Sequence, residues 1–303
     1  MKEKRAWLID SSIYVFKAWY THTECEDIEG NSINAVIGFM DFVYQLLSAE
    51  KPQLIAFAFD ESLATSHRKQ IYPQYKSNRS PAPENLRYQF SLCRTFIKAL
   101  GIYESASLHY EADDLIGTWA SHLNKESIPV NIITADKDLA QLVSIDDFWW
   151  EYLRGEKLDS KKITKRFGAK PSQIADQLAI AGDKSDNIPG VPGIGMSTAG
   201  KLLRKFENLD QLFSSLDEIS SMQIRGAVRV QQLISENQSL IRLSRKLTGI
   251  VCDIEEVSEQ HFEIVSTCPK ALEALCNQLN LSSESTNKWL KMHSLLSQNT
   301  ISL

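Results

Sequence analysis

Residues 53–60 read QLIAFAFD, a short apolar run that ends abruptly in an aspartate. Its length and composition are typical of a strand that is buried on both faces of a sheet. Residues 6–10 (AWLID) and 130–136 (VNIITAD) repeat the same pattern. The sequence therefore predicts three buried strands, each of which is followed directly by an aspartate.

Helical patterns lie between these strands. Apolar residues recur at helical spacing in residues 35–49, 85–100 and 113–124. Strands that alternate with helices indicate right-handed β-α-β units. We therefore expect an α/β fold with a mostly parallel central sheet flanked by helices.

The second half of the chain is predicted to be helical. After about residue 163, helical patterns cover residues 173–181, 197–206, 209–216, 221–243 and the tail from residue 269. The first two are joined by GDKSDNIPGVPGIG, a linker rich in turn-forming residues. We therefore expect an α/β domain over residues 1–162 and a helical domain over residues 163–303.

Composition excludes several classes of protein. A chain of 303 residues with 43% hydrophobic residues can bury a sizeable core. No apolar stretch approaches the ~18 residues of a membrane helix, and the apolar run near the start is too short for a secretory signal. The five cysteines are odd in number and form no CxxC pair, so we expect reduced thiols in a cytoplasmic protein. They are Cys25, Cys93, Cys252, Cys268 and Cys276.

Acidic residues gather where a parallel sheet binds its ligands. Asp10, Asp60 and Asp136 follow the three predicted strands, whose carboxyl ends border the ligand crevice of an open sheet. One such aspartate often only caps the next helix, but three strands with the same ending favour a site. Six further acids lie in YEADD, after the third strand and in the linker: Glu111, Asp113, Asp114, Asp138, Asp183 and Asp186.

These nine carboxylates predict a site for divalent cations. Crowded carboxylates repel one another unless a cation lies among them, and Mg²⁺ prefers oxygen ligands. Two such ions about 4 Å apart can activate a water and stabilise the leaving oxygen in phosphodiester hydrolysis. The formal net charge is −5, but without these nine acids 29 acidic residues face 33 Lys and Arg. The rest of the molecule therefore suits a polyanionic partner.

Residues 61–90 combine basic and aromatic side chains. Five Lys and Arg alternate with tyrosines and Phe90, a composition suited to single-stranded nucleic acid. The alternative is a solvated basic face whose aromatic residues enter the core. Pro73, Pro81 and Pro83 argue against one long helix.

Five segments, in order, resemble the 5′–3′ exonuclease/flap endonuclease family, and in particular the N-terminal nuclease domain of bacterial DNA polymerase I. They are LIDSSIYVFKAWY, FAFDE…SHRKQIYPQYKSNRSPAPE, YEADDLIG, ITADKDLAQLV and AGDKSDNIPGVPGIGMSTAGKLL, within residues 7–206. The chain departs from the family pattern at Ser11, where glycine is usual, and at His67, where phenylalanine is usual. Because no polymerase sequence follows, the resemblance is to a free-standing member.

The resemblance implies a PIN/resolvase-like nuclease core and a helix-hairpin-helix domain. It implies a monomer that hydrolyses DNA at 5′ ends or flaps in replication or repair, with two Mg²⁺ ions, or Mn²⁺, as cofactors. Two rival functions stay open. A silent protein that binds branched DNA is disfavoured by the full set of acids, and a related RNA nuclease is disfavoured by the hairpin after residue 173.

The resemblance also assigns roles to individual residues. The first metal position would take Asp10, Asp60, Glu111 and Asp113, and the second Asp136, Asp138 and Asp186, with Asp114 and Asp183 as direct or water-mediated ligands. Lys17 would touch the scissile phosphate. Lys76 and Arg79 would belong to a helical arch over about residues 61–90, with Arg68 and Tyr75 as further DNA contacts. The hairpin, residues 173–206, would hold duplex phosphates through Gly190, Gly193, Gly195 and Lys201, and K⁺ through the carbonyls of Val191 and Ile194.

Overall fold

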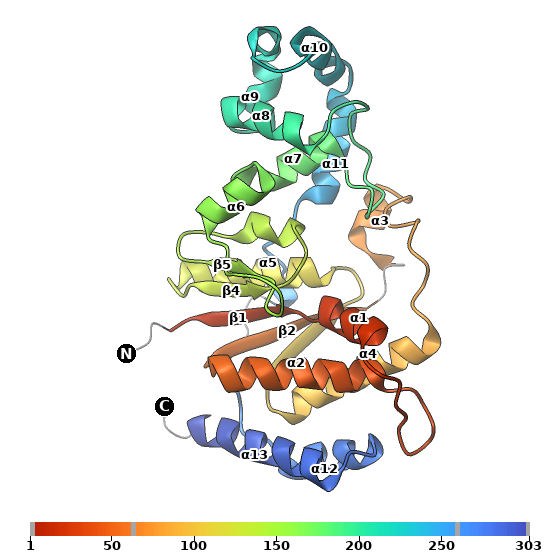
Figure 1. Ribbon diagram of the computed structural model, residues 1–303. Coiled ribbons are helices and arrows are strands. Elements are labelled where there is room, and N and C mark those ends of the chain that lie inside the picture. Colours follow the sequence, from red (N-terminus) through yellow and green to blue (C-terminus); the bar gives the residue numbers. More distant parts are fainter. Residues whose placement is uncertain (1–3, 62–64, 258–260, 301–303) are drawn as a thin grey trace.

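Five parallel strands form the central sheet of the computed structural model, which describes residues 4–61, 65–257 and 261–300 (Figure 1). The strand order is β3-β2-β1-β4-β5, and every pairing between neighbouring strands is parallel. The strands are β1 (Ala6–Asp10), β2 (Leu54–Asp60), β3 (Tyr103–Ser107), β4 (Val130–Ile133) and β5 (Phe148–Trp150). The predicted parallel sheet with flanking helices is confirmed.

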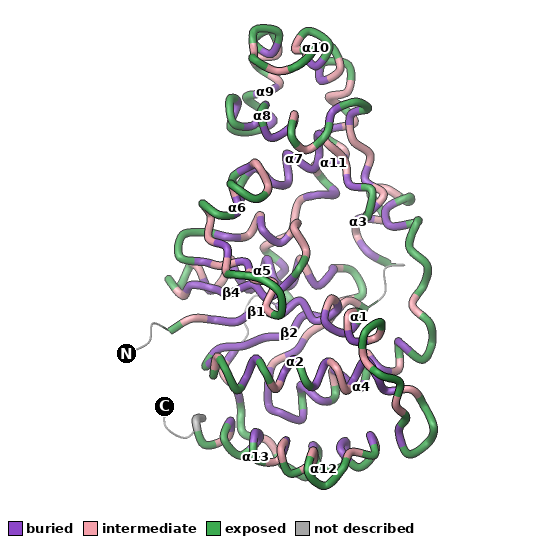
Figure 2. The backbone as a smooth tube through the Cα atoms, in the orientation of Figure 1, coloured by how far each residue is buried: buried purple, intermediate pink, exposed green. Residues whose placement is uncertain are grey.

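Alternate side chains of β1 and β2 enter two different cores. Trp7 and Ile9 pack with residues of α1 (Ser11–Thr21), α2 (Asn34–Glu50) and α4 (Glu84–Ala99). Leu8 and Ala56 instead pack on the opposite face with residues of α5 (Ala112–Lys125). This alternation follows from the period of two in a strand and explains why the runs are apolar throughout. Figure 2 shows the resulting buried layer at the sheet.

The helical part has a core of its own. Its helices are α6 (Ser160–Phe167), α7 (Ile174–Ala181), α8 (Met196–Phe206), α9 (Leu209–Ser214), α10 (Ala227–Glu236) and α11 (Gln238–Thr248). The prediction of one helix over residues 221–243 was wrong, because the chain turns at Gly226 (φ 72°) and breaks again at Asn237. The Asn237 amide donates to the Leu233 carbonyl, a local bond of the kind by which asparagine disfavours helix interiors.

The last two helices pack on the α/β part rather than on the helical part. Helices α12 (Pro269–Gln278) and α13 (Ser283–Thr300) lie beneath α2 and α4 in Figure 1. Trp289 of α13 meets Phe96 edge to face at 4.7 Å and Tyr44 at 5.5 Å between ring centroids. We expected residues 163–303 to form one helical domain, but its last two helices, α12 and α13, pack on the α/β part instead. Among the described helices, none has the length and apolar composition that crossing a membrane requires.

Candidate active site

Strand ends and the start of α5 bring the first group of carboxylates together. Asp10 ends β1 and Asp60 ends β2. The Asp60 Oδ1 atom accepts a hydrogen bond from the backbone N–H of Ala112 at 3.0 Å, which fixes Asp60 beside the first turn of α5. Glu111 precedes that turn and Asp113 lies within it. The group therefore consists of Asp10, Asp60, Glu111 and Asp113.

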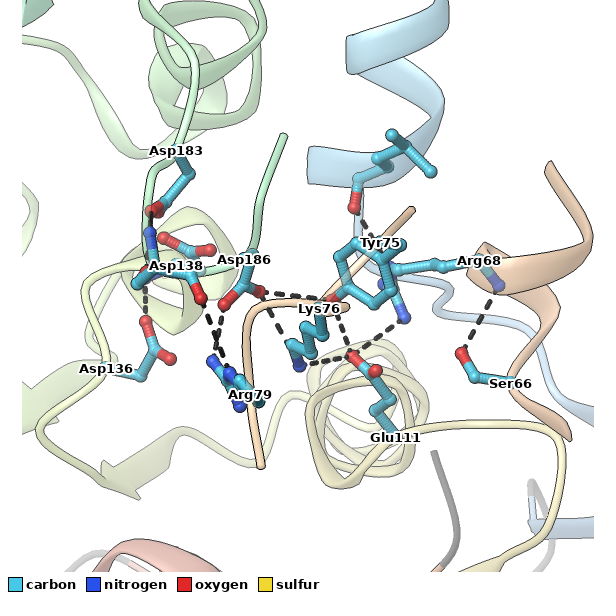
Figure 3. A network of polar contacts seen from close by, with 12 residues as sticks. Ser66, Arg68, Tyr75, Lys76, Arg79, Glu111, Asp136, Asp138, Asp183 and Asp186 are labelled. Atoms are coloured by element: carbon cyan, nitrogen blue, oxygen red, sulfur yellow. Dashed lines mark hydrogen bonds and ion pairs between the residues drawn. The ribbon is translucent and has the colours of Figure 1, made fainter. Parts of the chain in front are cut away.

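A second group gathers after β4 and in the linker between α7 and α8. Its members are Asp136, Asp138, Asp183 and Asp186 (Figure 3). The backbone N–H of Asp138 donates to Asp136 Oδ1 at 2.8 Å. Lys137 Nζ lies 2.5 Å from Asp183 Oδ2 and 3.4 Å from Asp138 Oδ1, so the lysine ties the linker to the sheet edge.

Residues that follow the five-residue helix α3 (His67–Ile71) connect the two groups (Figure 3). The Tyr75 hydroxyl lies 2.9 Å from Glu111 Oε2 and 3.1 Å from Asp186 Oδ2. Lys76 Nζ lies 3.0 Å from the same Glu111 atom and 3.5 Å from Asp186 Oδ2. Arg79 Nη2 lies 2.5 Å from Asp186 Oδ1. Three side chains of the predicted arch segment thus occupy the space between the acids.

The arch segment is not helical where it meets the carboxylates. After α3 the chain forms turns, Lys76 has a left-handed backbone (φ 50°), and helix resumes only at α4. Lys76 and Arg79, expected in a helical arch, therefore do not share a helical face, yet both contact Asp186. The three prolines of the segment explain why the helix does not continue.

Burial, and after it repulsion between neighbouring carboxylates, perturbs carboxyl groups in both clusters. Burial and the neighbouring Asp60 raise the pKa of Asp10 to about 8. Burial and Asp136 raise the pKa of Asp138 to about 7, and burial with several carboxylates holds the pKa of Asp113 well above its usual range. Such shifts mean that burial and the neighbouring carboxylates together outweigh the effect of the protein's own cations at these groups. Added positive charge would restore the ionised forms.

The donor set fits divalent cations. Glu111 Oε1 and Asp138 Oδ1 are buried and accept no hydrogen bond from the described residues, and the only described cation near the second of them is Lys137 Nζ at 3.4 Å. Among the described residues, no three carboxyl, imidazole or thiol groups already converge as ligands of one ion. Lys76 and Arg79 lie between the two carboxylate clusters instead. Cations bound here would neutralise the carboxylate charges that Lys76 and Arg79 now neutralise.

Asp114 and Arg68 differ from their expected roles. Arg68 Nη1 and Nη2 bind both oxygens of Asp114 at 2.6 and 2.7 Å, and the two residues are 2% and 0% exposed. This contact holds the pKa of Asp114 below its ordinary value although burial alone would raise it. Asp114 also accepts from the backbone N–H of Glu111. The pairing and burial argue against a direct metal contact for Asp114 and against a DNA contact for Arg68 in this structure. The water-mediated role expected as the alternative for Asp114 stays a prediction.

The hairpin turn between α7 and α8 depends on its glycines to different degrees. A Cβ on Gly190 would lie 2.3 Å from the backbone of Ala181, and Gly193 has φ 89°. Gly195 has ordinary backbone angles and open space around it. The side chains of Val191 and Ile194 enter the hairpin core, so only their carbonyls remain as ligands for a cation, and the Val191 carbonyl already accepts from the Ile194 N–H at 3.0 Å.

Two predicted basic contacts lie outside the carboxylate network. Lys201 is exposed in the second turn of α8. Lys17 is half-buried on α1, where burial and the nearby Arg154 lower the pKa of its ammonium. Both roles stay predictions.

Sequence reasoning missed three side chains that hold the carboxylates in place. Lys137 bridges Asp138 and Asp183, and the Thr134 hydroxyl donates to Asp10 Oδ2 at 2.8 Å. Gln141 donates to the Asp138 carbonyl. A signal for the first two was present, since both lie within two residues of Asp136 in ITADKD.

Comparisons with known proteins agree with this architecture. Residues 5–168 match the family described as 5'-3' exonuclease, N-terminal resolvase-like domain, and residues 169–269 match 5'-3' exonuclease, C-terminal SAM fold. A 5'-3' exonuclease of Buchnera aphidicola subsp. Schizaphis graminum is 31% identical over 276 residues, which cover 90% of this chain and 96% of that protein. DNA polymerase I of Bacillus caldotenax is 34% identical over 252 residues, which cover 82% of this chain and 28% of that protein.

Two solved structures share the fold. T5 5'-exonuclease with bound divalent metal ions (zinc) superposes with a TM-score of 0.64 at 16% identity, covering 96% of this chain and 99% of that one. The catalytic core of Rad2 in complex with DNA substrate gives a TM-score of 0.63 at 14% identity, covering 97% and 92%. With both family models matched in sequence order, the chain belongs to the 5'-3' exonuclease family of nucleases.

Proposed function

We propose that this nuclease is a divalent-metal-dependent 5′–3′ exonuclease and flap endonuclease that hydrolyses DNA phosphodiester bonds at 5′ ends or flaps. The observation that carries the proposal is the gathering of eight carboxylates in two groups at the carboxyl edge of the sheet. Lys76 bridges the two groups, and Arg79 binds Asp186 of the second. The divalent metals in T5 5'-exonuclease and the DNA in the Rad2 complex support it.

The carboxylates would bind two Mg²⁺ ions, with Mn²⁺ as a substitute. The first would take Asp10, Asp60, Glu111 and Asp113, and the second Asp136, Asp138, Asp183 and Asp186. Bound there, the cations would supply Lewis acidity and lower the pKa of a water. The protein contributes orientation, because Asp10, Asp60 and Asp136 each have one oxygen fixed by a hydrogen bond. Oxygens that are already fixed reduce the ordering cost when ligands are assembled.

Lys76 and Arg79 would act in the same reaction as mobile positive charges. Each is held by carboxylates that the cations would also bind. When cations take those carboxylates, the ammonium and guanidinium groups become available to the scissile phosphate, which both can bind strongly. Lys17 would add a further phosphate contact from α1. Tyr75, predicted as a further DNA contact, is only 2% exposed and is held by Glu111 and Asp186, so its ring is not open to a base in this structure.

The double variant Lys76→Ala/Arg79→Ala tests this role. We expect flap cleavage to fall more than duplex affinity, because the hairpin still holds the duplex. Each phosphate contact on a single strand contributes about 0.7 of a unit to the slope of log affinity against log salt, so the loss of two contacts should flatten the slope by about 1.4 units. Cleavage rates and affinities for a labelled 5′ flap, measured from low to high salt, check both. Wild-type cleavage by the double variant would contradict the role.

The hairpin would hold a duplex through backbone amides and Lys201, and its carbonyls at Val191 and Ile194 would hold K⁺. We expect Gly195→Val to weaken affinity for every duplex sequence alike while lowering the melting temperature only slightly, because a side chain there enters open space and only the N-cap preference of α8 is lost. Gly190→Val is the matched contrast and should lower the melting temperature, since its Cβ meets the Ala181 backbone. A sequence-selective loss of affinity in Gly195→Val would contradict contact through the backbone.

One experiment tests the proposed function directly. Labelled flap, nicked, blunt and single-stranded DNA, and a flap made of RNA, are incubated with the protein with and without Mg²⁺. We expect Mg²⁺-dependent cleavage of the DNA flap or of the 5′ end. In the cell, we propose, the protein is a cytoplasmic monomer that acts on replication and repair intermediates. Binding without cleavage would indicate a silent protein that binds branched DNA. Preferred cleavage of the RNA flap would indicate an RNA nuclease.

A further inference from the structure

Side chains near both carboxylate groups cap the end of helix α11. A helix leaves its last carbonyls without partners inside the helix. Here Arg68 Nε donates to the Leu247 carbonyl at 2.9 Å, and Gln141 Nε2 donates to the Thr248 carbonyl at 3.1 Å. We call residues 247–251, from the end of α11 onward, the α11 anchor.

Gln141 makes three hydrogen bonds that join the α11 anchor to Asp138. Besides the Thr248 carbonyl, its Nε2 atom donates to the Asp138 carbonyl at 2.9 Å. Its Oε1 atom accepts from the backbone N–H of Ile250 at 3.2 Å. Gln141 and Asp138 lie in the same five-residue 3₁₀ helix, Asp138–Leu142. Such a short helix has few hydrogen bonds of its own, so its position depends on what it is tied to.

The α11 anchor also reaches the first carboxylate group. The backbone N–H of Val251 donates to Asp114 Oδ1 at 2.9 Å, and Arg68 Nη2 donates to the Gly249 carbonyl at 2.8 Å. Asp114 in turn accepts from the backbone N–H of Glu111. One short stretch of chain thereby fixes the turn that carries Glu111 and the turn that carries Asp138.

We propose that Gln141 is a positioning residue that sets Asp138 against the first carboxylate group through the α11 anchor. The inference rests on the proposed function, in which the two groups bind cations. Gln141 contacts the backbone of Asp138 rather than its carboxylate, so it acts through Asp138 and not as a ligand. Outer partners that orient a ligand change metal affinity or activity by roughly 10- to 100-fold when they are replaced.

The same helix contacts the hairpin. The Ser244 hydroxyl of α11 donates to the Pro189 carbonyl in the hairpin turn at 2.5 Å. Leu247 packs with Ile188 of the same turn and with Tyr75. The element that sets the spacing of the carboxylates is thus fastened to the part of the chain proposed to hold duplex DNA.

The test measures Mn²⁺ binding to the full chain without DNA, by electron paramagnetic resonance. Gln141→Ala and the similarly sized Gln141→Met should both weaken Mn²⁺ about tenfold, as expected when an orienting partner is lost. In the same variants, kcat on a flap should fall while flap affinity in EDTA stays at the wild-type value. Gln89→Ala is the control: Gln89 is buried in α4 and accepts from the N–H groups of Ala35 and Val36, remote from the anchor.

The outcomes separate the inference from the proposed function. If Gln141→Ala binds Mn²⁺ within about twofold of wild type, far below the roughly tenfold effect of an orienting partner, the inference is wrong. Wild-type affinity in Gln141→Met would also overturn it, because side-chain volume rather than hydrogen bonding would then matter. So would an equal loss in Gln89→Ala, which would indicate general loosening. If the wild-type chain cleaves no flap, the proposed function fails, while the Mn²⁺ titrations still decide the role of Gln141.

Discussion

Asp136→Asn will abolish cleavage and leave DNA binding in place. The substitution keeps the size of the side chain and the oxygen that accepts from the Asp138 N–H, but it removes the charge that a cation needs. A catalytic cation supplies several kcal/mol of transition-state stabilisation, and each ~1.4 kcal/mol changes the rate tenfold. We therefore expect kcat on a flap to fall on the order of a thousandfold, with flap affinity in EDTA unchanged.

Stability provides an independent readout for the same variant. Burial raises the pKa of Asp136, which means that its ionised form destabilises the fold when pH exceeds that raised pKa. The asparagine side chain of the variant carries no charge, so in EDTA at neutral pH the melting temperature should not fall. Asp41→Asn, on the exposed side of α2, is the matched control and should cleave at the wild-type rate. Turnover near wild type in Asp136→Asn with Mg²⁺ would remove Asp136 from the metal site.

The sheet and its acidic edge were predictable because both depend on local sequence. A strand buried on two faces has to be apolar throughout. The sequence therefore changes abruptly from apolar residues to aspartate where the strand ends, as at Asp10 and Asp60. The edge strands were not predictable. β3 reads YESAS and β5 has three residues, so neither has the apolar length that marks a strand in sequence.

The contacts that organise the site were beyond sequence reasoning because they join distant segments. Lys76 meets Asp186 across 110 positions, and Gln141 meets Thr248 across 107. A lysine in a basic segment is as compatible with solvent as with buried carboxylates, and only the fold distinguishes the two. Arg68 shows the same limit, since its position among basic residues suggested DNA while the fold buries it.

Arg68→Met will be the most destabilising of the substitutions considered. Arg68 is 2% exposed, and its removal leaves the Asp114 carboxylate buried without its cation and the Leu247 and Gly249 carbonyls without their donor. Breaking a buried ion pair by removing one partner typically costs about 3–5 kcal/mol, so we expect a loss of that size in the free energy of unfolding in urea. An exposed DNA contact would lose less than about 1 kcal/mol.

A double variant tests whether the unpaired charge of Asp114 causes the loss of stability. Arg68→Met with Asp114→Asn removes both charges and keeps an oxygen that can accept from one of the N–H groups bound by Asp114. It should recover part of the stability, since the buried charge left unpaired is the main cost in the single variant. The pH dependence has a definite sign. Because the pKa of Asp114 is lowered in the folded protein, its contribution is present above the ordinary carboxyl pKa and is lost as pH falls below it. The difference between wild type and Arg68→Met should therefore shrink in acid. A difference that grows in acid would show that Asp114 is not the partner whose charge Arg68 compensates.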